Sequence, residues 1–207
     1  CPTHAGVSLG EDGGSHQSVE DVALMRAIPG MVVLSPADAV ETEKMVFAVA
    51  EYEGPVYVRL GRLNIPVLFD ENYKFEIGKA ATLREGNDVA ILATGLMVSE
   101  ALEAAKLLEE KGVKARVVNV STIKPLDTET VLKAAKECKF IVTSEEHSVI
   151  GGLGSAVSEY LSEVHPTKVV KHGIQDVFGQ SADGETMLTN YGLRAKDIAQ
   201  TVLNNLK

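Results

Sequence analysis

Residues 29–60 read PGMVVLSPADAVETEKMVFAVAEYEGPVYVRL, and this stretch decides the fold class. The apolar run at 31–34 predicts a short buried strand. Ser35-Pro36 predicts the N-cap and first position of a helix that continues to about Glu53, where Gly54-Pro55 ends it. Residues 56–60 predict the next strand. A strand, a helix and a second strand in this order are typical of a parallel sheet with crossover helices.

The chain on both sides of this stretch continues the alternation. Upstream, Ser18 predicts the N-cap of a short helix over 18–28, with Asp21 in the capping-box position. Residues 61–87 break any periodicity and predict a connection. From Asp88 onward the pattern predicts a second α/β unit, with strands at 88–94, 114–120, 140–143 and 167–171, a helix capped by Asp127, and helices at 152–164 and 195–206. We therefore predict an α/β fold with three-layer, mostly parallel sheets and crossover helices: a partial first domain followed by a complete, smaller C-terminal α/β domain.

The composition is that of an ordinary globular protein, with 45% hydrophobic and 24% charged residues. The 20 basic and 29 acidic residues give a net charge of −9, and the basic residues form no cluster. This argues against nucleic acid or an anionic membrane as a partner. No apolar run is long enough to span a bilayer. Cys1 and Cys138 show no metal-ligand spacing, which favours a reducing compartment and predicts a cytoplasmic protein.

The segment Thr3 to Gln17, THAGVSLGEDGGSHQ, is the richest in chemistry. It holds His4 and His16, the adjacent Glu11 and Asp12, and four glycines that allow tight turns and close approach to a ligand. Imidazoles and carboxylates together can hydrogen-bond a polyhydroxylated substrate and transfer protons. Because His16 precedes a predicted helix, the positive end of the helix dipole favours its neutral form.

Two other interpretations of this segment stay open. His4, Asp12 and His16 carry donor types that suit zinc or manganese, although their spacing matches no standard metal motif. The segment is also compatible with a solvated surface loop.

Arg62 follows the strand predicted at 56–60. In parallel α/β sheets, ligands bind beyond the carboxyl ends of the strands. A guanidinium there can hold a phosphate through two hydrogen bonds, and a surface salt bridge is the competing interpretation. Arg59 lies inside the predicted strand, where a structural ion pair is expected.

A third segment, SEEHSVIGGLG at 144–154, combines a strand, a glycine-rich turn and a helix. It superficially resembles a phosphate cradle, but it is neither G-x-G-x-x-G nor a P-loop. We interpret Gly151, Gly152 and Gly154 as packing residues between strand and helix.

These residues resemble the transketolase family. The resemblance rests on the THAGVSLGEDGGSHQSVEDVALMRAIPGM block, on RLGRLNIP and on EEHSVIGGLG, and it spans essentially the whole chain. The family's relatives include the deoxyxylulose-phosphate synthases and the β-subunits of pyruvate-type dehydrogenases. The β-subunits usually carry a shorter His-Ser-Gln-Ser version of this loop. The full GEDGGSHQ pattern favours transketolase. As a whole, the chain is similar to the C-terminal subunit of a split transketolase.

The resemblance implies transfer of a two-carbon ketol unit between sugar phosphates in the pentose phosphate pathway. It implies thiamine diphosphate and Mg²⁺ at a dimer interface, in a homodimer or with an N-terminal transketolase subunit. Carried onto this chain, it makes His4 and His16 the catalytic and substrate-site histidines, Asp12 the contact to substrate hydroxyls and Arg62 the phosphate ligand. Glu11 matches the motif, but no direct contact with the substrate is assigned to it.

The family's diphosphate and metal motif, G-D-G followed by an asparagine, does not occur in this sequence. Nor does the chain carry the family's aminopyrimidine-activating glutamate with its stacking aromatic residues, so the cofactor-binding residues in this chain are unknown and no metal ligand is assigned. By resemblance, residues 1–67 are the C-terminal part of a pyrimidine-binding domain, 68–77 a linker and 78–207 the transketolase C-terminal domain. We expect a fragment that is inactive alone. The alternatives are part of a 2-oxo acid dehydrogenase or deoxyxylulose-phosphate synthase, or a non-catalytic binding module.

Overall fold

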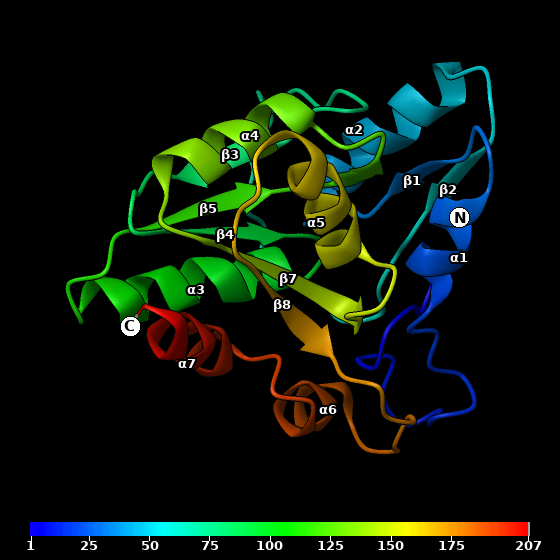
Figure 1. The fold of residues 1–207 in the computed structure, drawn as a ribbon. Helices are drawn as coiled ribbons and strands as arrows, with labels where there is room; N and C mark the ends of the chain where they lie inside the picture. The colour runs from blue at the N-terminus through cyan, green and yellow to red at the C-terminus, as the bar shows by residue number, and fades with distance from the viewer. Residues whose placement is uncertain (207) are drawn as a thin grey trace.

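The computed structural model describes residues 1–206, which form two sheets with helices on their faces (Figure 1). The first sheet has the order β2-β1-β6, from β1 (Val32–Leu34), β2 (Val56–Val58) and β6 (Thr122–Lys124). The second has the order β3-β5-β4-β7-β8, from β3 (Ala81–Arg84), β4 (Val89–Ala93), β5 (Ala115–Asn119), β7 (Ile141–Ser148) and β8 (Val169–Ile174). All neighbouring strands are parallel except β1 with β6 and β3 with β5. The mostly parallel α/β class predicted from the sequence is confirmed.

Alternate side chains of the buried strands belong to different cores. In β4, Val89, Ile91 and Ala93 lie in one apolar cluster with α3 (Met97–Glu109) and α7 (Ala195–Asn205). Ala90 and Leu92 lie in another with α4 (Thr128–Glu137) and α5 (Leu153–Val164). Because side chains of a strand alternate between its faces, the second sheet becomes the middle of three layers, as Figure 1 shows.

The first sheet is covered in the same way by α1 (Asp21–Ala27) and α2 (Ala39–Glu51). Val33 packs in a cluster with Val22 of α1, whereas Leu34 packs with Met45 of α2. The β6 strand comes from the region predicted as the C-terminal domain, yet it pairs with β1. The two units are therefore joined through the first sheet as well as through the connection between them, and the division at 67 and 78 stays a prediction.

Two predicted helix caps are wrong. The N-cap of α1 is Glu20 and not Ser18, because Asp21, the expected capping-box partner, pairs with Arg59 instead. The N-cap of α2 is Asp38 and not Ser35, and its carboxylate accepts the Glu41 N–H over 2.7 Å. A carboxylate is a strong acceptor for the unpaired N–H groups of a first turn. The cap predicted at Asp127 is confirmed, with acceptance from Thr130 N.

The region 61–87 is more structured than predicted, since it contains β3. Residues 68–77 of this region contact the unit that contains the first sheet, because Leu68 and Phe69 donate their N–H groups to Asp38. Phe69 also stacks on Tyr73, with ring centroids 3.8 Å apart. β6 and the short α6 (Gly184–Asn190) were not predicted from the sequence, and β7 ends at Ser148 instead of at the predicted residue 143. The longer strand puts Glu145, Glu146 and His147 inside the protein.

Candidate functional site

The glycine-rich segment at 3–17 forms a series of turns closed at its base. Gly6 donates to the carbonyl of Ser18 over 2.8 Å, and Ala5 donates to the carbonyl of Leu60 over 3.2 Å. Gly6, Gly10 and Gly13 have φ angles of 88°, 89° and 81°, a region that favours glycine. We call residues 3–17 the glycine loop.

The glycine loop rests on the C-terminal unit. Gln17 Nε2 donates to the carbonyl of Gln180 over 2.8 Å, and Gln17 Oε1 accepts the Gln180 N–H over 3.2 Å. A Cβ on Gly14 would lie 2.9 Å from the carbonyl carbon of Gly179. Figure 1 shows the same approach between the N-terminal segment and the segment that leads into α6.

The structure brings two of the four predicted site residues into contact. Nη1 of Arg62 lies 3.2 Å from Oδ2 of Asp12, although the residues are 50 positions apart, and it also donates to the carbonyl of Leu9 over 2.7 Å. The surface salt bridge proposed as the competing role of Arg62 is thus present.

The two histidines are exposed, and the structure does not join them to this pair or to each other. Nδ1 of His4 lies 2.8 Å from Oγ1 of Thr3, and Nδ1 of His16 lies 3.1 Å from Oγ of Ser15. His4 has a φ of 67°, an unusual angle outside glycine. Both imidazoles are therefore held only by their neighbours among residues 1–206.

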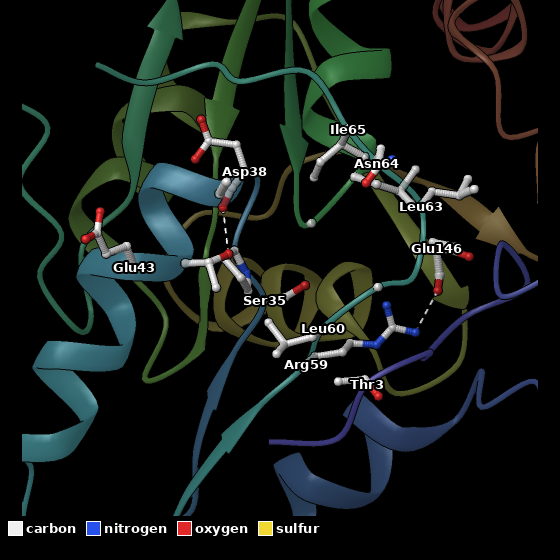
Figure 2. Close-up of a pocket in the computed structure, with 16 residues that line it drawn as sticks. Thr3, Ser35, Asp38, Glu43, Arg59, Leu60, Leu63, Asn64, Ile65 and Glu146 are labelled. Carbon is white, nitrogen blue, oxygen red and sulfur yellow. Dashed lines mark hydrogen bonds between the residues drawn. The ribbon is translucent and has the colours of Figure 1, made fainter. Parts of the chain in front are cut away.

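A cavity of about 550 Å³ opens beside the glycine loop, where strands of both sheets end (Figure 2). Ser35 follows β1, Arg59 follows β2, Gly95 lies just beyond β4, and Glu146 belongs to β7. Thr3, Gly61 and Leu63, the chain neighbours of His4 and Arg62, also line it. The cavity lies beyond the carboxyl ends of strands, where α/β sheets bind ligands, but His4, Asp12, His16 and Arg62 do not line it.

Arg59 and Asp21 form a buried ion pair below the loop. Nε of Arg59 donates to Oδ2 of Asp21 over 2.8 Å, the same oxygen accepts the Tyr57 hydroxyl over 2.7 Å, and the side chains are 8% and 6% exposed. Burial alone would raise the pKa of Asp21, but the charge and hydrogen bond of Arg59 outweigh it and hold that pKa below its usual value. The structural ion pair expected for Arg59 is confirmed.

The segment at 144–154 contains a helix cap inside the protein. Both oxygens of Glu145 accept N–H groups of the first turn of α5, from Leu153 over 2.7 Å and from Gly154 over 2.8 Å. Burial raises the pKa of Glu145 to about 7, against the opposing effect of these N–H donors. A Cβ on Gly152 would overlap the Glu145 carboxylate. The cradle is thus filled by the chain's own carboxylate, in agreement with the packing interpretation of these glycines.

Glu146, which the sequence did not single out, contacts the glycine loop. Its Oε1 accepts the Ser8 N–H over 2.6 Å. A usable signal existed: neighbouring residues of a strand face opposite sides, so adjacent glutamates on a buried strand must each find a separate partner.

Comparisons with known proteins agree with this architecture. Residues 1–67 match the family model described as the transketolase pyrimidine binding domain, and residues 78–198 match the transketolase C-terminal domain. A Methanocaldococcus jannaschii protein provisionally described as a transketolase C-terminal section is 46% identical over 208 residues, covering 99% of this chain and 65% of that protein. An apulose-4-phosphate transketolase subunit of Phocaeicola vulgatus is 42% identical, with 98% and 65% covered.

Solved structures give the same result. A split gene transketolase, described as an inactive beta4 tetramer, superposes with a TM-score of 0.92 at 50% identity over 99% of this chain and 65% of that one. A Pichia stipitis transketolase in complex with sedoheptulose-7-phosphate gives 0.81 at 27% identity, over 99% and 29%.

The two α/β units, joined by the glycine loop, and the two matching family models identify the class of the protein. The chain belongs to the transketolase family and corresponds to the C-terminal portion of its members. It spans 65% of the length of the two curated relatives named above.

Proposed function

We propose that this chain supplies substrate-binding residues to a thiamine diphosphate-dependent transketolase, which moves a two-carbon ketol unit between sugar phosphates. The proposal rests on the contact between Asp12 and Arg62 at the edge of a loop that also carries His4 and His16. An exposed carboxylate, a guanidinium and two imidazoles provide the groups that a phosphorylated polyol needs.

In this proposal each side chain has a separate role. Arg62 binds the substrate phosphate, for which its Nε and Nη2 are not used in the two hydrogen bonds described above. Once the substrate phosphate replaces Asp12 as a partner of Arg62, the Asp12 carboxylate accepts hydrogen bonds from substrate hydroxyls. His4 and His16 hydrogen-bond the reacting oxygens, and His16 moves a proton to or from them.

The sequence lacks the family's diphosphate and metal motif. Within residues 1–206, no three His, Cys, Asp or Glu side chains lie where they could hold a metal ion together. We assign the Mg²⁺ and diphosphate site to a partner, which is an N-terminal transketolase subunit or a second copy of a longer chain. The Phocaeicola vulgatus relative is named as one subunit of a transketolase, which supports the first of these arrangements.

The particular sugars and the compartment also belong to the proposal. A 6-deoxy-6-sulfo-D-fructose transketolase subunit of a Clostridium species is 45% identical over 94% of this chain, so ordinary pentose phosphates are one choice among related substrates. No helix within residues 1–206 has the length and apolarity needed to cross a membrane. Both cysteines are free, which suits the reducing cytoplasm that we propose.

The test is to coexpress the chain, with any native upstream sequence, and its N-terminal partner, then add thiamine diphosphate and Mg²⁺. Ketol transfer from a ketose phosphate to an aldose phosphate is expected with the assembled protein. Formation of 1-deoxy-D-xylulose 5-phosphate instead would favour the second candidate, since the synthase of a Synechococcus strain is 39% identical over 98% of this chain. Assembly and cofactor binding without either product would overturn the proposal.

A further inference from the structure

Glu146 contacts the glycine loop from the opposite unit of the protein. It lies on β7 of the second sheet, it is 4% exposed, and its Oε1 accepts the Ser8 N–H over 2.6 Å from 138 residues away. Its neighbour Glu145 points to the other side and caps α5. Two consecutive buried carboxylates thus serve different units, one its own helix and the other the loop.

The loop backbone is fitted to this carboxylate. A Cβ on Gly6 would overlap the carboxyl group of Glu146, and Gly6 also adopts a left-handed φ of 88°. Only glycine satisfies both conditions without displacing the carboxylate. The turn that begins the loop and the position of Glu146 therefore depend on each other.

The surrounding charges hold Glu146 in place. Nη2 of Arg59 donates to the Glu146 backbone carbonyl over 2.9 Å and to the Ser18 carbonyl over 3.3 Å, and Ser18 closes the base of the loop. Burial raises the pKa of Glu146, while the charge of Arg59 and donation from Ser8 favour the carboxylate. A buried carboxylate costs free energy unless it is hydrogen-bonded, so this contact is a strong constraint on the loop.

We propose that Glu146 is a positioning residue of the candidate site: by holding Gly6 to Ser8, it sets the path of the loop that carries Asp12 to Arg62 and presents His16. This inference rests on the proposed function and adds to it a task for the C-terminal unit. Glu146 also lines the cavity, but the role proposed here requires no contact between its side chain and the substrate. It acts through the loop backbone.

The test compares Glu146→Ala, Glu146→Gln and Glu145→Ala in the assembled enzyme. Glu146→Ala is expected to lower kcat/KM for the sugar phosphate by about 10- to 100-fold, mostly through KM, because one hydrogen bond to a charged group is lost and the substrate-binding side chains shift. Glu146→Gln keeps an acceptor oxygen of the same shape and should restore activity to within about fivefold of wild type.

The matched control is Glu145→Ala, which removes an equally buried carboxylate from the same strand but leaves the loop contact intact. It should lower the melting temperature, while kcat/KM per folded enzyme stays within about threefold of wild type. If Glu146→Ala keeps wild-type kcat/KM, or if Glu145→Ala loses as much activity per folded molecule, Glu146 has only a structural role.

Hydrogen exchange in the same assembled proteins separates this inference from the proposed function. Glu146→Ala should speed amide exchange at residues 6–10 at least tenfold, and Glu145→Ala should not. A wild-type assembly without ketol transfer would contradict the proposed function, whereas unchanged exchange at 6–10 in Glu146→Ala would contradict the positioning role directly.

Discussion

Nη1 of Arg62 lies 3.2 Å from Oδ2 of Asp12, and the two side chains are 44% and 50% exposed. An ion pair this exposed contributes at most about 1 kcal/mol to stability. Its contribution to stability is therefore small, and substitutions can separate a structural role from the substrate-binding role that we propose.

We predict that Arg62→Ala in the complete enzyme impairs phosphorylated sugars far more than unphosphorylated ones. The lost two-pronged phosphate contact corresponds to about 1.5–3 kcal/mol, or roughly 10- to 150-fold in kcat/KM. Steady-state kinetics on matched donor sugars with and without the phosphate measures the difference. Equal losses on both sugars would mean that Arg62 only holds the loop.

His16→Ala is expected to lower kcat/KM of the complete enzyme by roughly 10²- to 10⁴-fold, the usual effect of losing a positioned proton-transfer group. Because the ring is exposed and, within residues 1–206, hydrogen-bonds only with Ser15, the melting temperature should change little. His165→Ala, at the C-terminal end of α5 and outside the glycine loop, is the matched control, and its kcat/KM should stay near that of wild type.

Because the structure does not bring His4, Asp12 and His16 together within residues 1–206, we expect no metal ion bound by these residues. If the protein instead holds one stoichiometric zinc or manganese ion, and chelation removes the ion and lowers the melting temperature, these residues are metal ligands and not substrate-binding residues. Elemental analysis of the purified protein before and after chelation decides between the two.

The 207-residue chain alone should not bind thiamine diphosphate tightly. The reason is that its residues 1–206 bring no metal-binding group of side chains together and its sequence lacks the family's diphosphate motif. Calorimetric titration with cofactor and Mg²⁺ should show no saturable heat, whereas the assembly with its partner should. Micromolar affinity of the chain alone would refute this.

Asp21→Asn should lower the free energy of unfolding by about 3–5 kcal/mol, because it leaves the buried Arg59 guanidinium without its counter-charge. Chemical denaturation of the assembled protein measures the loss. Glu103→Gln, which breaks an exposed pair with Lys106, is the control and should cost less than about 1 kcal/mol.

The pH dependence of stability should carry a contribution from Glu145. Its pKa is raised from 4.5 to about 7 in the folded protein, so the fold favours the protonated form. The stabilisation is complete below pH 4.5 and is lost as the pH rises through 7. Glu145→Gln should remove this loss, which is on the order of 3 kcal/mol.

Denaturation curves at pH 5 and pH 8 measure that effect as a difference from wild type, so that other titrating groups cancel. His147 acts in the opposite direction, since burial lowers its pKa. The same slope in Glu145→Gln and wild type would show that Glu145 does not titrate in this range.

The sequence alone determined the features that depend on neighbouring residues. Apolar runs and helical spacing predicted the α/β alternation, Asp127 predicted a helix cap, and Arg59 in its predicted strand predicted a structural ion pair. Burial on one face and the needs of a helix's first turn are local constraints, so neighbouring residues are enough to predict them. The THAGVSLGEDGGSHQ motif identified the candidate residues His4, Asp12 and His16, and the separate RLGRLNIP segment identified Arg62. The sequence did not show which of these four residues contact one another.

Only the tertiary structure decided the contacts between distant segments. The pairing of β6 with β1, the ion pair of Asp12 with Arg62 and the hydrogen bond from Ser8 to Glu146 join residues 50 or more positions apart. Asp21 satisfied Arg59 and so could not complete the predicted capping box, and Asp38 replaced Ser35 as the cap of α2. Where one side chain has several possible partners, the packing of the two sheets selects among them, and no local pattern of residues contains that choice.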